Sequence, residues 1–333
     1  MVASQRVISR MHPALSVIFF TSVSGCGYGL LFLLAIALAV EPRMLPHAAA
    51  VVALVSGVVF AAAGLTASML HLGKPLRAWR AFSQWRSSWL SREGVAAVAS
   101  FIPALVLFVA LWRGGNTTLV RSTALALALL AITTVWCTAR IYTSLKTVQA
   151  WNNAYALPGY LLFALLGGAG WLWLLLAFNG RHATLSQYIM PLLVAFLAAW
   201  CALIKGGYWK HIDTAPAAAN AESATGLGRF GTVSSFEAPH TQANYLTHEM
   251  GFVLARKHSA RLRVIALVLF AVVPVAVAIF TFVMASPALT FGSAAIAALS
   301  ITAGTFVERW LFFAEAKHVV MLYYGERGLR SEG

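Results

Sequence analysis

Long apolar runs without charged residues follow one another along this chain. Seven stretches contain no Asp, Glu, Lys or Arg: 13–40, 44–73, 94–112, 122–139, 147–180, 182–204 and 264–307. A bilayer core about 30 Å thick needs about 20 apolar helical residues per crossing, so each stretch predicts a transmembrane helix. The last stretch would be about 66 Å long as one helix. Because Ser286-Pro287 interrupts it near its middle, it predicts two crossings.

The pattern favours helices over a membrane β-barrel. A barrel strand needs an alternation of apolar and polar residues over about ten positions, which these continuous runs lack. Helices also satisfy their own backbone hydrogen bonds in lipid. We therefore predict an all-α polytopic protein, with 1–333 as a single integral membrane domain. The eight predicted spans lie near 14–40, 46–70, 94–112, 119–141, 157–178, 186–205, 263–285 and 289–312.

Composition and charge agree with this class and predict an orientation. Hydrophobic residues make up 60% of the chain and charged residues only 10%, against about 25% charged in soluble domains. The net charge of +14 does not indicate a nucleic-acid partner here, because the basic residues lie almost wholly between apolar runs, where they set topology. On the side of the N-terminus 20 Lys and Arg collect, against four on the other side. Both termini are therefore expected in the cytoplasm.

Redox metals and haem are not expected in this protein. The three cysteines, Cys26, Cys137 and Cys201, contain no CxxC pair, so they cannot supply the four thiolates of an ordinary iron–sulfur cluster. No two histidines lie deep in facing helices, as a haem with two histidine ligands would need. No residues cluster at the spacing of a metal site either.

The segment 71–93 is an amphipathic stretch between the second and third spans. Pro75 suits the first position of a helix. Four aromatic residues recur at spacings of three, three and four, which predicts a shared face: Trp79, Phe82, Trp85 and Trp89. Basic residues surround them: Lys74, Arg77, Arg80 and Arg86. The segment is either a basic anchor at headgroup depth on the cytoplasmic side or a docking surface for a soluble partner. The segment 206–262 is a second cytoplasmic insertion, between the sixth and seventh spans.

Ionisable residues at the ends of spans are the candidates for chemistry, since such groups are costly in a membrane. His71 ends the second apolar stretch, where an imidazole could hydrogen-bond a quinone oxygen and exchange a proton. The alternative is a histidine that only caps the span. Glu93 opens the third span, where it is either a capping charge at a helix N-terminus or a proton acceptor beside His71.

Further charged residues lie near the ends of the fourth and eighth spans. Arg140 ends the fourth span, where snorkelling to the interface accounts for it. Glu308, Glu315 and His318 follow at spacings of seven and three, which predicts a common face. Arg309 is expected to point elsewhere. This face is either a proton path or the place of an ion pair between Glu308 and an arginine of another span.

Three stretches are similar to the membrane anchor subunits of dimethyl sulfoxide reductase type molybdoenzymes. The most specific is Ser68–Ala78 with Leu90–Glu93. The others are Arg140–Tyr142 with Thr147-Val148, Trp151 and Pro158-Gly159, and Glu308–His318. The long 206–262 insertion and the cytoplasmic placement of His71 resemble the anchors of cytoplasmic sulfite dehydrogenases within this family.

The resemblance implies a function in electron transport within a complex of three subunits. The partners would be a molybdopterin catalytic subunit and an iron–sulfur electron-transfer subunit, with this chain in the lipid of a bacterial inner membrane. The family's anchor binds quinone, menaquinone or ubiquinone, and no haem. Its quinol-site histidine corresponds to His71 and its acidic residue to Glu93, with Arg77 and Arg140 as further candidates for quinone binding. Electrons would flow into quinone in a sulfite-oxidising complex, which we favour.

Two other functions remain open on the sequence. The first is an anchor that oxidises menaquinol for reduction of dimethyl sulfoxide or another S- or N-oxide. The second is of another class, an eight-helix transporter. No matching pair of Gly- or Pro-broken helices supports the transporter.

Overall fold

The structure is a computed structural model in which eight helices are long and apolar enough to cross a membrane. It describes residues 15–43, 45–69, 75–114, 116–178, 185–215, 219–234, 258–284, 286–319 and 322. His71 and Lys74 lie outside the described residues. No strand occurs within these ranges, and the prediction of an all-α, eight-helix membrane protein is confirmed.

The eight spans are formed by continuous or slightly distorted helices. Their bounds are α1 Leu15–Val40, α2 His47–Met69, α3 Trp89–Trp112, α4 Thr117–Thr143, α5 Ala156–Phe178, α6 Met190–Thr214, α10 Ser259–Leu267 continuing through the π-helical turn η4 Val268–Val272 into α11 Val273–Met284, and α12 Pro287–Ala314. The π-helical turn η2 Leu185–Ile189 leads into α6. Within the described ranges, three short helices lie outside the spans: η1 Pro75–Gln84, α7 Ala221–Thr225 and η3 Gly228–Phe230.

Two spans extend beyond the lengths that the sequence indicated. Helix α3 begins at Trp89 rather than near 94, and Trp89 makes an edge-on contact with Trp136 of α4, their ring centroids 5.0 Å apart. Helix α6 continues past Lys205 to Thr214, because Tyr208 and Trp209 are buried in its last turns. Lys205, the last residue of the predicted span, therefore lies inside the helix and not at its end.

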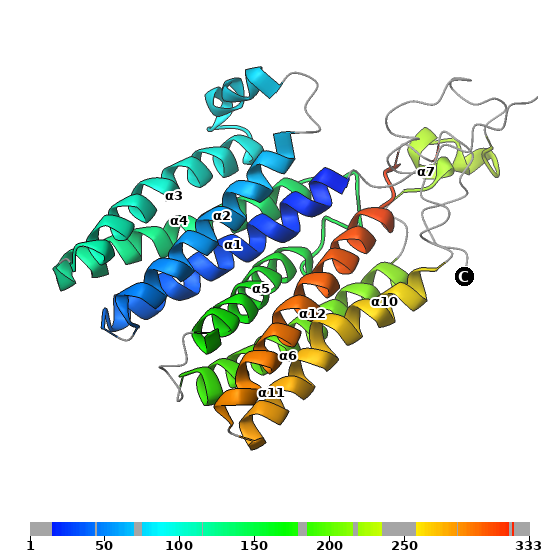
Figure 1. The fold of residues 1–333 in the computed structure, drawn as a ribbon. Coiled ribbons are helices and arrows are strands. Elements are labelled where there is room, and N and C mark those ends of the chain that lie inside the picture. The colour runs from blue at the N-terminus through cyan, green and yellow to red at the C-terminus, as the bar shows by residue number, and fades with distance from the viewer. Residues whose placement is uncertain are drawn as a thin grey trace, which may run out of the picture.

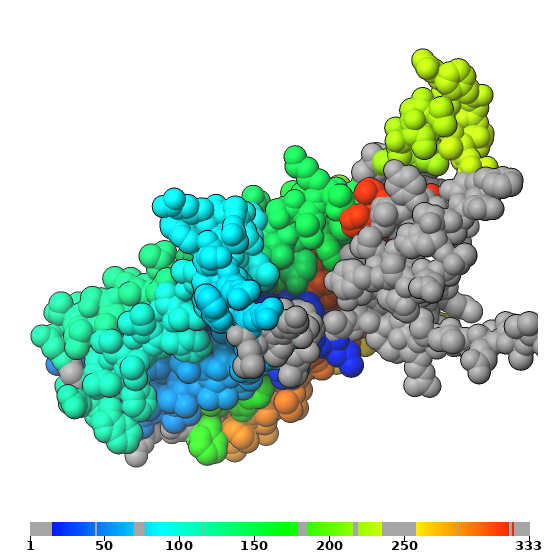
Figure 2. Space-filling view, turned by 90° about the horizontal axis from the view of Figure 1, so that it is seen from above, coloured from blue at the N-terminus to red at the C-terminus, as the bar shows by residue number. Residues whose placement is uncertain are grey.

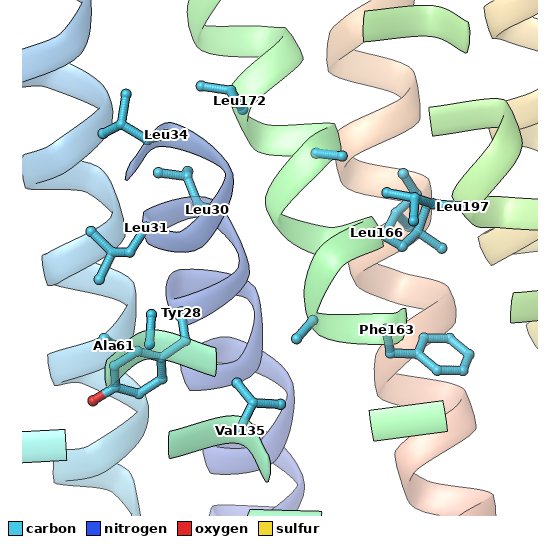
Figure 3. Close-up of a cluster of buried hydrophobic side chains, with 14 of the residues drawn as sticks. Tyr28, Leu30, Leu31, Leu34, Ala61, Val135, Phe163, Leu166, Leu172 and Leu197 are labelled. Carbon is cyan, nitrogen blue, oxygen red and sulfur yellow. The ribbon is translucent and has the colours of Figure 1, made fainter. Parts of the chain in front are cut away.

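Helix α1 is central to the packing. It contacts α2, α4 and α5, while α12 packs on α5 and on α10. Figure 1 shows α1 to α4 as one group of helices beside α5, α6, α10, α11 and α12. In Figure 3 the leucines of α1 lie between α2 and α5: Leu30, Leu31 and Leu34. The two groups of helices thus share one apolar core along α1 and α5.

Glycines set the distance between α1 and α5. A Cβ atom at Gly29 would lie 1.8 Å from the carbonyl oxygen of Ala164, and one at Gly168 would lie 2.2 Å from the carbonyl carbon of Gly29. Both neighbours are backbone atoms, so they can move only if the helices separate. Small residues at such positions allow close helix packing in membranes.

The variant Gly29→Ala is expected to destabilise the bundle by about 1–3 kcal/mol, the usual cost of inserting a methyl group into a packed core. The midpoint of thermal unfolding in detergent measures this. Gly292→Ala is the matched control, because a methyl group added there would have no atom within 4 Å. Equal stability of the two variants would contradict the close contact of α1 and α5.

The η1 helix lies against the first turns of α3 at one end of the bundle. It is a 3-10 helix rather than an α-helix, with exposed Trp79 and Trp85. Arg92 of α3 fixes the turn after it, donating from Nε to the carbonyl of Trp85 at 3.0 Å and from Nη2 to that of Arg86 at 2.6 Å. Figure 2 shows η1, in cyan, standing out from the surface of the bundle.

Alternating helix directions bring several segments to the same end of the bundle as η1. These are the ends of α2, α4, α6 and α12 and the beginnings of α3, α5 and α10 (Figure 1). We call this the η1 end. There the segment after α12 pairs with the turn after α4, through a bridge between Val148 and His318 and a hydrogen bond from Val319 N to Thr147 O of 3.1 Å.

Candidate functional site

Glu93 is a buried carboxylate in the first turns of α3. Only 3% of its surface is exposed, and the hydroxyl of Thr138 on α4 donates a hydrogen bond to its Oε1 atom. Thr138 is placed one turn from Thr134, whose carbonyl its hydroxyl also contacts at 3.0 Å. An exposed helix-capping charge would face water, whereas the carboxylate of Glu93 is enclosed by the protein.

A small polar cavity adjoins this hydrogen bond. Residues of α1, α4, α5 and α12 line it, among them Tyr28, Thr138, Tyr160 and Arg309. The guanidinium of Arg309 lies over the ring of Tyr160, 3.7 Å from its centroid. The hydroxyl of Tyr160 and the Nε atom of Arg309 make no hydrogen bond within the described part of the chain. Both are therefore free to bind water or a polar group of a ligand.

An apolar cavity of about 90 Å³ lies next to the polar one. The two share four lining residues, Ser22, Cys26, Phe163 and Thr305. Phe60 and Trp171 form another part of the apolar wall, with ring centroids 4.9 Å apart. Polar groups thus lie beside an apolar wall, the combination of surfaces that small-molecule sites use.

Glu308 belongs to a buried ionic cluster, and its contacts show that two predictions from the sequence were wrong. Its Oε1 atom is 2.7 Å from Nζ of Lys205 on α6, and its Oε2 atom is 3.1 Å from Nη1 of Arg309. Lys205, Glu308 and Arg309 are exposed by only 3%, 1% and 3%. The partner from another span is thus a lysine and not an arginine, and Arg309 does not point away from Glu308.

Glu315 and His318 lie beyond the last residue of α12, in different environments. Glu315 pairs with Arg263 of α10 at 2.8 Å, and Arg263 also contacts the half-exposed Asp213 at 2.6 Å. Burial raises the pKa of the Glu315 carboxyl, although Arg263 opposes the shift. His318 is not on the α12 face with Glu308, since the helix ends at Ala314, and burial lowers its pKa.

The arginines that the sequence suggested for quinone binding or partner docking lie at the contact of α3 with α4 and on or just after η1. Arg140 lies beside two tryptophans at the α3–α4 contact, with its Cζ atom 5.1 Å from the ring centroid of Trp89 and 6.0 Å from that of Trp136. Arg77 is exposed on η1. Arg80 and Arg86 are also exposed there, over the rings of Trp79 and Trp85.

The sequence pattern did not identify Lys205, Arg309, Tyr160 and Thr138 as site residues. Lys205 falls in a loop if a charge is taken as the end of a span. The signal that it lies within a span is the apolar pair Tyr208-Trp209 after it. For the hydroxyl residues the sequence carries no such signal, since Thr and Tyr are common in membrane helices. In the ranges that the structure describes, no three His, Cys, Asp or Glu residues come together as metal ligands would.

The molecule has the fold of a multi-pass membrane protein with buried polar groups near one end, and comparisons with known proteins place it in a family. The family model described as DMSO reductase anchor subunit (DmsC) matches residues 10–325. The chain therefore belongs to the DMSO reductase anchor subunit family.

Two curated relatives show the range of this family. The C subunit of the sulfite dehydrogenase of Allochromatium vinosum is 33% identical over 345 aligned positions, which cover 94% of this chain and 99% of the relative. The C chain of the anaerobic dimethyl sulfoxide reductase of Escherichia coli is 29% identical over 163 positions, covering 48% of this chain and 57% of the relative. This protein is thus a membrane anchor subunit of the family.

Proposed function

We propose that this protein binds a quinone of the membrane pool at a site formed by His71 and Glu93. There it would exchange electrons between that quinone and an iron–sulfur subunit. The observation that carries the proposal is the buried carboxylate of Glu93, which is hydrogen-bonded to Thr138 on the wall of the polar cavity. A quinone, when bound, supplies the chemistry of gaining or losing two electrons and two protons. Menaquinone and ubiquinone both fit this description.

The residues present fit such a molecule. The donors of Tyr160 and Arg309 that lack a described partner can bind carbonyl oxygens. The adjoining apolar cavity suits part of an apolar ring or tail. Glu93 would hold or release a proton at its carboxyl group, while Thr138 positions that group by donating to Oε1.

The partners proposed for this anchor are an iron–sulfur electron-transfer subunit and a molybdopterin catalytic subunit. The exposed arginines of η1 and of the turn after it would dock the iron–sulfur subunit: Arg77, Arg80 and Arg86. Lys74 is proposed to take part as well. The three arginines lie at the same end of the bundle as Glu93, which would keep the electron path between partner and quinone short. Arg140 lies beside Trp89, its buried Nε atom has no hydrogen-bond partner within the described ranges, and it remains a candidate for quinone binding.

A sulfite-oxidising complex that reduces quinone is the version we favour. The relative named as part of a sulfite dehydrogenase aligns over nearly the whole chain, whereas the relative named as part of a dimethyl sulfoxide reductase aligns over about half. The second candidate is menaquinol oxidation for reduction of an S- or N-oxide. A transporter has no support from the family to which the chain belongs.

The η1 end is proposed to face the cytoplasm of a bacterial cell, with the protein in the inner membrane. Lys205 and Arg309 are buried, so they do not count as loop charges. Without them, 18 basic residues remain on the side of the η1 end against four on the other. The rule that positive charges remain inside therefore still predicts cytoplasmic termini.

The variant His71→Ala is expected to weaken quinone binding about tenfold, the effect of losing one hydrogen bond worth about 1.4 kcal/mol. Binding of short-chain ubiquinone and menaquinone analogues is measured on membranes that contain the whole complex, at matched assembly. His258→Ala is the control, because that residue is exposed at the η1 end. Unchanged affinity in His71→Ala would remove His71 from the site.

A further inference from the structure

Two ion clusters lie between the polar cavity and the water at the η1 end. The inner cluster is Lys205, Glu308 and Arg309, and Arg309 also lines the cavity. The outer cluster is Glu315, Arg263 and Asp213. The side chain of Asp213 is 46% exposed, whereas the three residues of the inner cluster are buried. Two groups of ionisable residues thus lie one after the other between a buried cavity and the surface.

Tyr208 and Trp209 of α6 fill the space between the clusters. The ammonium of Lys205 lies 3.7 Å from the ring centroid of Tyr208 and 5.2 Å from that of Trp209. On the other side, Cζ of Arg263 lies 5.7 Å from the ring of Trp209. Glu308 and Glu315 are separated by seven positions, about 10 Å along a helix, which is too far for a direct proton transfer.

Polar atoms in this gap can bind water. The hydroxyl of Tyr208 and Nε1 of Trp209 are buried and have no hydrogen-bond partner within the described ranges. Buried waters usually connect such groups. At the inner end, the polar cavity has space of about 10 Å³, enough for about one water, and it borders Thr138, the partner of Glu93.

Stability alone does not account for these buried charges. A buried ion pair is often no more stable than apolar residues of the same volume, because desolvation offsets the attraction. Ionisable groups inside a membrane commonly mark proton pathways. The inner cluster also contains two cations and one carboxylate, which is not the balanced composition expected of a purely structural pair.

We propose that these clusters form a proton relay between the aqueous phase at the η1 end and the polar cavity beside Glu93. The inference rests on the proposed quinone function, in which quinone reduction takes up two protons for the two electrons that the iron–sulfur subunit supplies. In each transfer an N–H bond of Lys205 breaks and an O–H bond forms on Glu308. That O–H bond then breaks as the proton moves through water into the cavity that Arg309 lines, and an O–H bond forms on the carboxylate of Glu93. Glu315 and Asp213 return a proton to Lys205 through water beside Tyr208.

Arg309 and Arg263 position the carboxylates of the relay and do not transfer protons themselves. Arg309 is a positioning residue, because a guanidinium stays protonated in proteins and here fixes Oε2 of Glu308. Arg263 does the same for Glu315 and Asp213. The place of His318 on a proton path stays a prediction from the sequence.

Glu315→Gln tests the relay in the purified complex, because the amide retains the shape and can still accept from Arg263. Reduction of a short-chain ubiquinone analogue is expected to slow about tenfold, less than the 10²-fold or more of a directly positioned acid or base. The solvent isotope effect on the rate should rise, the dissociation constant of the analogue should not change, and acetic acid should restore part of the rate. Glu41→Gln, an exposed carboxylate at the opposite end, is the control.

Vesicles that contain the wild-type complex test the direction of the relay without any variant. With an electron donor that releases no protons when it is oxidised, such as reduced methyl viologen, a pH dye inside and outside should report proton uptake from the side that carries the partner subunits. Uptake from the opposite side would overturn the relay. The relay would also be overturned if both Glu315→Gln and Asp213→Asn had the wild-type rate and the wild-type solvent isotope effect. If instead the wild-type complex neither binds the analogue nor transfers electrons to it, the proposed quinone function itself fails.

Discussion

Replacing Glu93 by glutamine is expected to slow quinone-linked electron transfer by about 100-fold, the lower end of what a positioned acid or base contributes. Glutamine retains the size of the side chain and can accept the hydrogen bond from Thr138. It cannot bind or release a proton near neutral pH. The rate is measured in the assembled complex with a short-chain ubiquinone analogue, and partner assembly is checked by the iron–sulfur absorption.

Two further variants show whether the loss is chemical. Thr138→Val removes the donor to Glu93 but leaves the carboxyl group, so its rate should fall less than that of Glu93→Gln. Glu41→Gln, at the other end of the bundle, should have the wild-type rate. A Glu93→Gln complex with full activity would show that the carboxylate has only a structural role near the start of α3.

Replacing Glu308 by leucine is expected to lower the free energy of unfolding by about 3–5 kcal/mol, the cost of leaving a buried charge without its partner. Glu308 is the acidic member of a cluster with two buried cations. Without it, Lys205 and Arg309 would lie close together with no counter-charge. The midpoint of thermal unfolding of the purified subunit in detergent measures the loss.

The charges in the cluster predict how the stabilities of two further variants compare with that of Glu308→Leu. Lys205→Met leaves Arg309 and Glu308 as a balanced pair, so it should destabilise less than Glu308→Leu. The double variant Glu308→Leu with Lys205→Met leaves one buried cation instead of two and should be more stable than Glu308→Leu alone. A Lys205→Met variant that unfolds more readily than Glu308→Leu would contradict this account of the charges.

The quinone prediction and the stability prediction concern different parts of the structure. Glu93 is held by a neutral hydroxyl, so its loss should change the rate more than the stability. Glu308 is held by two cations, so its loss should change both. Comparing rate and unfolding midpoint across the variants separates a chemical role from a structural one.

The sequence by itself determined the number of crossings and the family. Helices in lipid must be continuously apolar over about 20 residues, so the uncharged runs led directly to eight spans, and the pattern around His71 and Glu93 indicated the family. The sequence also singled out Glu93, Glu308 and Glu315, since charges near spans are rare enough to be noticed. Their partners were not predictable, because side chains from α4, α6 and α10 meet them only in the folded bundle.

Only the tertiary structure decided where each charged residue lies relative to water. Lys205 and Arg309 are adjacent to loops in the sequence, yet the helices bring both against Glu308 in the interior. Helix α6 continues past a lysine because a neighbouring span supplies the opposite charge and aromatic rings supply further contacts. A hydropathy pattern records the cost of each residue alone in lipid, whereas pairing between spans is a property of the assembled bundle.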